Sequence, residues 1–100
     1  MKLDRDRLGT QSVRQPKHVV SRAFPSETVV LNLETGTYHG LNPTGGRMLE
    51  ELNKASSVDA AAVKLAAEFG QSTEVVERDL FEFCTGLIER GLLEVEPAAG

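Results

Sequence analysis

The chain has 100 residues, enough for one domain with one small hydrophobic core. Apolar residues make up 40% of it, and no window approaches the 18 uninterrupted apolar residues of a membrane-spanning helix, so we expect no membrane segment. The net charge of −4 is unevenly divided, since residues 1–17 carry five bases against two acids and residues 18–100 carry six bases against thirteen acids.

Residues 1–17 are polar and show no hydrophobic periodicity, so the sequence predicts a flexible basic N-terminal arm there. This segment lacks the apolar stretch of a secretory signal, and the single Cys84 cannot form an internal disulfide. Both features favour a cytoplasmic protein. We predict that residues 18–95 form the folded domain and that residues 96–100 are a disordered tail.

Three short strands are predicted, over residues 18–23, 27–33 and 37–41. Gly36 suits the left-handed position of a three-residue hairpin connection with a bulge. That connection would pair Leu33 with Thr37 and Val29 with Leu41, so that Leu41 is buried with the aliphatic residues of the second strand. The alternative, a two-residue turn, would place Tyr38 on that face instead. The bulged connection is the preferred interpretation because it buries Leu41.

Three helices follow, over residues 43–54, 58–69 and 73–90. Asn42-Pro43 is a strong start signal for the first helix, whereas Gly70 and Gly91 are suited to end the second and third. Gly45 and Gly46 weaken the first helix, which predicts that another backbone passes close to it. Strands followed by helices indicate an α+β fold, a three-stranded antiparallel sheet followed by three helices and resembling a winged helix-turn-helix.

Catalytic and metal-binding patterns are absent from the sequence. Cys84 lies on the apolar stripe of the third helix, where a reactive thiolate is not expected. His18 and His39 are the only imidazoles, which is too few ligands for a metal site together with one core cysteine. We therefore predict that the protein is not an enzyme and binds no metal or cofactor.

The second and third helices have the order of a DNA-binding helix-turn-helix, but the charge is wrong. Residues 73–90 carry Arg78 and Arg90 against five acids, a net charge of −3. Because affinity for DNA depends mainly on neutralising phosphates with Lys and Arg, we expect no nucleic-acid partner. A winged-helix DNA-binding regulator remains the alternative function, together with a dimerisation module.

The third strand carries neither Lys nor Pro to protect an edge, and it has no run of apolar residues. Such a strand is either covered by the fold or free to accept an extended peptide through main-chain hydrogen bonds. Tyr38 and His39 would project on opposite faces and flank a guest side chain, and Gly40 leaves room for its approach. Replacing His39 with Pro should then weaken binding, because the ring removes a strand donor.

The ordered set of segments LNLETGTYHGLNPTGGRMLEEL and VVERDLFEFCTGLIERGLL, separated by an Ala-rich helix, resembles the PqqD-like family. These are coenzyme PQQ synthesis protein D and its relatives, which recognise precursor peptides in ribosomal natural-product pathways. The resemblance covers about residues 18–95. Its most specific parts are Thr35-Gly36 with Tyr38, Leu41-Asn42-Pro43, Asp79, and the closing Arg90-Gly91-Leu92.

The resemblance implies a winged helix-turn-helix fold that binds a leader peptide as an added strand and delivers the core peptide to a separate enzyme. The style of the hairpin is similar to stand-alone lasso-peptide proteins, whose partners are a leader peptidase and a cyclase; the partner of PqqD itself is a radical SAM enzyme. The implied peptide-binding residues are Thr37, Tyr38, His39 and Gly40 on the strand, and Val76, Asp79, Leu80 and Phe83 on the third helix.

Overall fold

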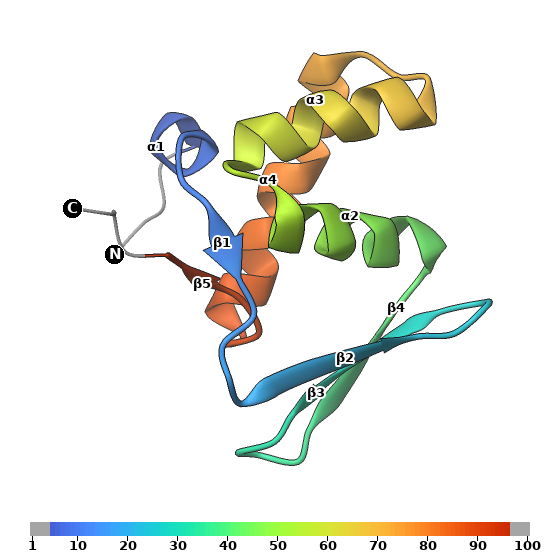
Figure 1. Ribbon diagram of the computed structural model, residues 1–100, viewed down its shortest axis with the longest axis vertical. Coiled ribbons are helices and arrows are strands. Elements are labelled where there is room, and N and C mark those ends of the chain that lie inside the picture. Colours follow the sequence, from blue (N-terminus) through green and yellow to red (C-terminus); the bar gives the residue numbers. More distant parts are fainter. Residues whose placement is uncertain (1–4, 97–100) are drawn as a thin grey trace.

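An antiparallel sheet lies at one end of the molecule, and all the larger helices pack on one side of it (Figure 1). The computed structural model describes residues 5–96. The sheet has the order β2-β3-β4, with β2 at Val19–Ala23, β3 at Thr28–Asn32 and β4 at Tyr38–Leu41. The helices α2 (Pro43–Lys54), α3 (Val58–Phe69) and α4 (Thr73–Glu89) follow. The predicted α+β fold of three strands followed by three helices is confirmed, although it is only loosely a winged helix.

Side-chain caps fix where each helix begins. The Asn42 side chain accepts a hydrogen bond of 2.7 Å from the Gly45 N–H, and Ser57 and Ser72 cap α3 and α4 in the same way. Left-handed glycines follow two of the helices, with φ of 66° at Gly70 and 74° at Gly91. The predicted helix boundaries therefore follow from local chemistry.

The hydrophobic core lies between the inner face of the sheet and the three long helices, and the first and last segments that the structure describes contribute side chains to it. Burial of this apolar surface is the main stabilising contribution to the fold. Its most completely buried large side chains are Leu8, Leu52, Leu65, Leu80, Leu92, Leu93, Val13, Val30, Val76 and Cys84.

The predicted flexible arm is wrong for the part of it that the structure describes. Residues Arg5–Gly9 form a short helix, α1, and Val13–Arg14 form strand β1. β1 pairs antiparallel with β5 (Glu94–Val95), and Arg14 forms an ion pair of 3.3 Å with Glu94. Leu8 and Val13, each 1% exposed, enter the core and exclude water from it. The domain therefore begins well before residue 18.

The pairing of β1 with β5 also holds the last described residues of the chain in place. The N–H of Glu96, the first residue of the predicted tail, donates to the Ser12 carbonyl at 2.9 Å. The rest of the predicted tail, residues 97–100, and residues 1–4 of the predicted arm lie outside the described residues. The two ends of the described chain thus lie side by side, with β1 beside β5 (Figure 1).

The preferred hairpin register is wrong, and the alternative pairing is present. Tyr38 pairs with Leu31, and Leu41 pairs with Thr28. A four-residue loop, 33–36, achieves this pairing in place of a two-residue turn. The Asn32 side chain accepts from the N–H groups of Glu34 and Thr35, which stabilises the loop, and Gly36 has the expected positive φ of 74°.

The shift in register reverses the expected faces of β3. Val30, 1% exposed, and Asn32 face the core, together with the half-buried His39 and Leu41 of β4. Val29, Leu31 and Leu33 lie on the outer face, where Leu33 is 57% exposed. Leu41 is thus on the inner side as predicted, but with a different set of partners.

The prediction that another backbone passes close to Gly45 and Gly46 is wrong. The atoms nearest to these two glycines belong to side chains. A Cβ on Gly46 would overlap the Thr28 Oγ1, and a Cβ on Gly45 would lie 3.4 Å from the Phe83 ring. The first turn of α2 therefore packs closely against both β3 and α4.

Candidate peptide-binding cleft

The free edge of the sheet is β4, which pairs with β3 and with no second strand among residues 5–96. The Asn32 N–H donates to the Thr37 carbonyl at 2.8 Å, so bonded pairs alternate from there along the ladder. Thr37, His39 and Leu41 therefore direct their backbone groups at β3. Tyr38 and Gly40 direct theirs away from it, and they form the open template of the edge.

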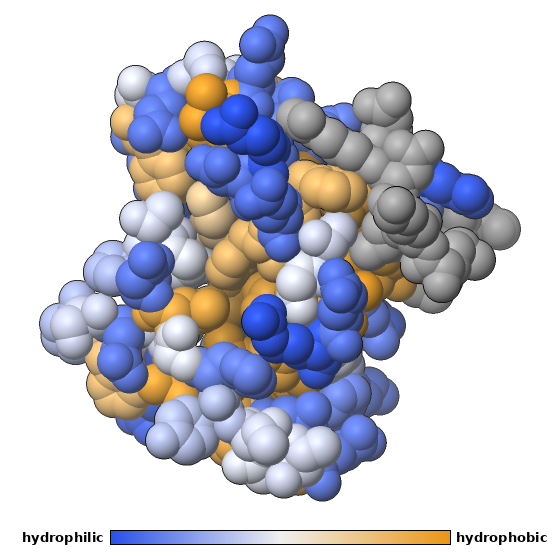
Figure 2. Space-filling view, turned by 180° about the vertical axis from the view of Figure 1, so that it is seen from behind, coloured by the Kyte–Doolittle hydropathy of each residue, from blue (hydrophilic) through white to orange (hydrophobic). Residues whose placement is uncertain are grey.

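A cleft of about 540 Å³ adjoins this edge. One side is formed by the end of β4 and the start of α2, through Gly40, Leu41, Asn42, Thr44, Gly45 and Met48. The facing wall is α4, through Asp79, Glu82 and Phe83. Its volume lies within the usual range for ligand sites in proteins. On the face seen in Figure 2, apolar surface is visible in the hollow between the helical part of the molecule and the sheet.

The structure brings together three of the predicted site residues, Gly40, Asp79 and Phe83, around the cleft. Tyr38 and His39 belong to the same strand but project to opposite sides, as expected. Tyr38 is 71% exposed on the outer face of the sheet, and His39 is half-buried on the helix side. Thr37 is exposed, and its backbone carbonyl already bonds to Asn32.

Two predicted wall residues are in the core and not on the wall. Val76 and Leu80 are 1% and 0% exposed, so they support α4 from behind. Successive residues of a helix are rotated by about 100°, and the buried positions of α4 are Val76, Leu80, Cys84 and Leu87. Asp79, Glu82 and Phe83 lie to one side of that stripe and reach the cleft.

Six cleft residues were not predicted from the sequence: Leu41, Asn42, Thr44, Gly45, Met48 and Glu82. A usable signal was present for most of them. The Asn42-Pro43 start signal directly after the strand means that the first turn of α2 must adjoin the end of β4. Glu82 follows Asp79 by three residues, which places it on the same side of α4.

The wall carries two carboxylates, and only that of Asp79 has a cation nearby. Glu82 is exposed, and its carboxylate makes no hydrogen bond or ion pair with any side chain that the structure describes. The Asp79 side chain is 50% exposed, and its nearest cation is Arg78 at 3.8 Å. No Lys, Arg or His is among the described residues that line the cleft.

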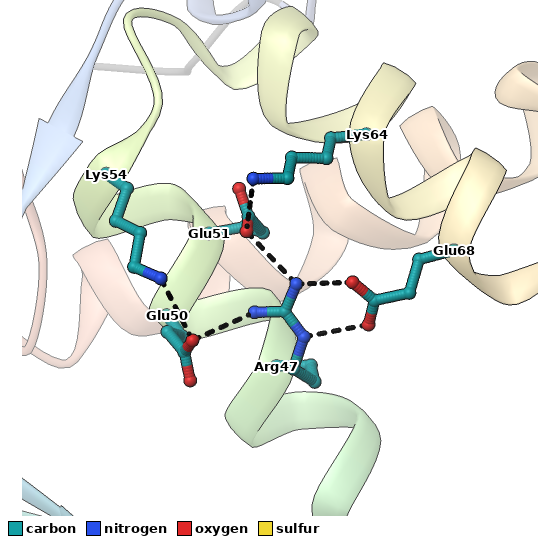
Figure 3. Close-up of polar contacts among 6 residues, drawn as sticks. All are labelled: Arg47, Glu50, Glu51, Lys54, Lys64 and Glu68. Carbon is teal, nitrogen blue, oxygen red and sulfur yellow. Dashed lines mark hydrogen bonds and ion pairs between the residues drawn. The ribbon is translucent and has the colours of Figure 1, made fainter.

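An ionic cluster holds α2, and with it one side of the cleft, against α3 (Figure 3). The Arg47 guanidinium donates to Glu68 of α3 at 2.8 Å and to Glu51 at 3.0 Å. Lys64 of α3 lies 3.4 Å from the same Glu51 oxygen. Glu51 is only 3% exposed, so its charge depends on these two cations.

The cluster shifts the protonation of its members. Hydrogen bonding to Arg47 lowers the pKa of Glu68 below its ordinary value. It also lowers the pKa of Glu51, with a further contribution from Lys64 and against the opposing effect of burial. The two carboxylates in turn raise the pKa of Arg47. All three groups are therefore charged at neutral pH.

Among the described residues, neither a reactive thiol nor a metal centre is present. Burial raises the pKa of the Cys84 thiol to about 12, so the residue is a core side chain and not a nucleophile. Among the residues that the structure describes, no three His, Cys, Asp or Glu side chains converge as a metal site would require. None of the described helices is both long and apolar enough to cross a bilayer.

The geometry agrees with one protein family. The family model described as coenzyme PQQ synthesis protein D matches residues 27–93, which include the whole of β3, β4 and the three long helices. The chain belongs to the PqqD family. The resemblance stated from the sequence is thereby confirmed. No curated protein gives a significant match.

Two solved structures share the fold of this PqqD-family chain. The protein in "TbiB1 in Complex with the TbiA(beta) Leader Peptide" is 32% identical, with a TM-score of 0.73, and the match covers 87% of this chain and 99% of that one. The protein in "Lasso peptide synthetase B1 complexed with the leader peptide" is 24% identical, with a TM-score of 0.75, over 83% and 98%. At that identity the second match supports the fold alone.

Proposed function

We propose that the protein captures the leader region of a ribosomal precursor peptide as an added strand on β4. The single observation that carries this proposal is the open edge at Tyr38 and Gly40 beside the cleft walled by α4. Two residues with outward N–H and C=O groups can pair with an extended guest, and the cleft can receive its alternate side chains. The 32%-identical relative, solved with a leader peptide, supports the same reading.

In this proposal the protein is a non-catalytic, cytoplasmic partner of a separate modifying enzyme. That enzyme is a leader peptidase with a cyclase in a lasso-peptide pathway, or a radical SAM enzyme in a PQQ-type pathway. The resemblance of the hairpin to lasso-peptide proteins favours the first. The protein would hold the leader while the core peptide is processed elsewhere.

The test is a proline at Gly40, where the lost N–H points at the guest. His39, suggested by the sequence, is the wrong position because its N–H bonds to β3. A fluorescently labelled leader peptide that binds the wild-type protein, with the TbiA(beta) leader as the first probe, should bind Gly40→Pro about tenfold or more weakly than wild type, because one strand hydrogen bond is lost and a guest carbonyl is left unpaired. Fluorescence anisotropy measures the affinity.

Ser21→Pro is the matched control, because Ser21 has the same outward backbone orientation on β2, at the opposite edge of the sheet. It should bind the leader as wild type does, and circular dichroism should show that both variants are folded. Equal affinity of the two folded proline variants would contradict strand addition on β4. The alternative is that two copies of the protein pair through their β4 edges. Light scattering would then show a dimer of the wild-type protein that dissociates when the leader is added.

A further inference from the structure

Successive side chains of β4 point to opposite faces of the sheet, and a paired guest strand follows the same pattern, which determines which guest side chains enter the cleft. This inference rests on the proposed strand addition. Guest residues opposite Tyr38 and Gly40 would share the outward direction of those residues, away from the helices. Guest residues opposite His39 and Leu41 would point to the inner side, toward α4. Specificity for the inward residues must therefore come from the wall and floor of the cleft.

The inner side presents two kinds of surface. Leu41, Met48 and the half-buried Phe83 ring give the cleft an apolar part of its lining. Asp79 and Glu82, one helical turn apart on α4, add two carboxylates to the same lining. Inward residues of an extended guest recur about every 6.6 Å, close to the 5.4 Å pitch of the facing helix. Consecutive inward residues can thus meet consecutive turns of α4.

We propose that the cleft selects a guest segment with a Lys or Arg side chain at an inward position, where it pairs with Asp79 and Glu82. The carboxylate of Glu82 has no partner among the described residues, and that of Asp79 has only the 3.8 Å contact with Arg78. A long basic side chain can pack its stem on Phe83 while its charge reaches both carboxylates.

The same wall discriminates against acidic guests. An Asp or Glu at the inward position would face two like charges with no cation among the cleft residues to offset them. Adding a guest strand also removes water from the cleft, which strengthens the effect of each charge. The preference for a basic residue at that position therefore has two sources: attraction of a basic side chain to the two carboxylates, and repulsion of an acidic one.

The experiment is selection from a library of random short peptides displayed on phage against the full-length protein. Peptides selected on wild type should share a Lys or Arg at one fixed position. In resynthesised peptides, changing this residue to Glu should weaken binding roughly fivefold to tenfold, with a smaller difference at high salt. The double variant Asp79→Lys with Glu82→Lys should select an acidic residue there instead.

Two further variants control for net charge and for folding. Glu74→Lys with Glu89→Lys makes the same charge change on the same helix outside the cleft, and it should keep the basic preference. Asp79→Asn with Glu82→Gln keeps the shapes of the side chains and should abolish the preference. The inference is overturned if wild type and the Asp79/Glu82 lysine variant select the same charge.

Failure of this inference can be separated from failure of the proposed function. Peptides that lose affinity for Gly40→Pro but show no charge preference would overturn the inference and leave strand addition intact. Peptides that bind Gly40→Pro as well as wild type would contradict strand addition, and the inference with it.

Discussion

Gly45 is the residue at which the first turn of α2 meets the wall of the cleft. A Cβ there would lie 3.3 Å from the Asn42 capping oxygen and 3.4 Å from both the Leu41 Cβ and the Phe83 ring. The contact with the Asn42 oxygen is tighter than ordinary packing, so that capping oxygen must move slightly if a methyl group is added, and the methyl group would then lie against Leu41 and the Phe83 ring. Gly45 thus sets the shape of the cleft as well as the entry of the helix.

We expect Gly45→Ala to weaken leader binding by roughly fivefold, because Gly45 lines the cleft and the added methyl group occupies part of the surface available to the guest. The gain in helix propensity, up to about 1 kcal/mol, should be offset by the crowding, so thermal stability should change little. Titration calorimetry and thermal melting measure the two effects.

Gly86→Ala is the control, since Gly86 lies on α4 away from the cleft and a Cβ there meets only the flexible end of Arg90, at 3.2 Å. It should stabilise the protein by about 0.5–1 kcal/mol and leave binding unchanged. If Gly45→Ala binds the leader as tightly as Gly86→Ala, the assigned role of Gly45 in shaping the cleft is wrong.

At the scale of elements, the Arg47 cluster couples α2 to α3 in a pH-dependent way. The pKa values of Glu51 and Glu68 are lowered in the folded state, so each group binds a proton less readily there than in the unfolded chain. Their contribution is therefore fully present above the ordinary pKa of 4.5 and is lost as pH falls through the lowered values.

Glu51→Gln should lower the free energy of unfolding at pH 7 by about 1–3 kcal/mol, because a charge-assisted bond in a buried position is lost. It should also flatten the decline in stability between neutral and acidic pH. Urea unfolding across that range tests this. The exposed Glu50→Gln should have an effect below about 1 kcal/mol. An unaltered acid decline in Glu51→Gln would show that Glu51 is not the coupled group.

The elements differ in how far they could be predicted. The strands and helices of residues 19–89 carry their own signals, as Asn42, Ser57 and Ser72 show at the helix starts. The hairpin register carries no such local signal, because the Asn32 side chain stabilises a four-residue loop where shorter turns were also possible. In the cleft, the edge position of β4 was predictable from its composition. The placement of Val76 and Leu80 on the wall, which the family resemblance implied, was wrong because both residues lie on the buried apolar stripe of α4.

At the scale of the whole molecule, the first described segment closes the core. Leu8 and Val13 stand among charged and polar residues, so no periodicity marks them as core residues. Their burial depends on distant parts of the chain, since Val13 pairs with Val95 of β5 and the short helix that carries Leu8 contacts α3 and α4. Long-range pairing of this kind, here between β1 and β5, is not visible in a local pattern.

Leu8→Ala should therefore destabilise the protein by about 2–5 kcal/mol, the usual cost of a cavity at a buried leucine. Chemical denaturation measures the change. Phe24→Ala, which removes a larger but 50% exposed side chain, should cost clearly less. A Leu8→Ala variant as stable as wild type would indicate that residues 5–14 are not part of the cooperative fold.

The central claim, strand addition on β4, is tested most directly by amide hydrogen exchange measured by NMR with and without saturating leader peptide. In the free protein, the Tyr38 and Gly40 amides should exchange fast, and the His39 amide, bonded to β3, should be protected. With the leader bound, Tyr38 and Gly40 should become protected, and His39 should change little. Fast exchange at both Tyr38 and Gly40 in the saturated complex would contradict the account.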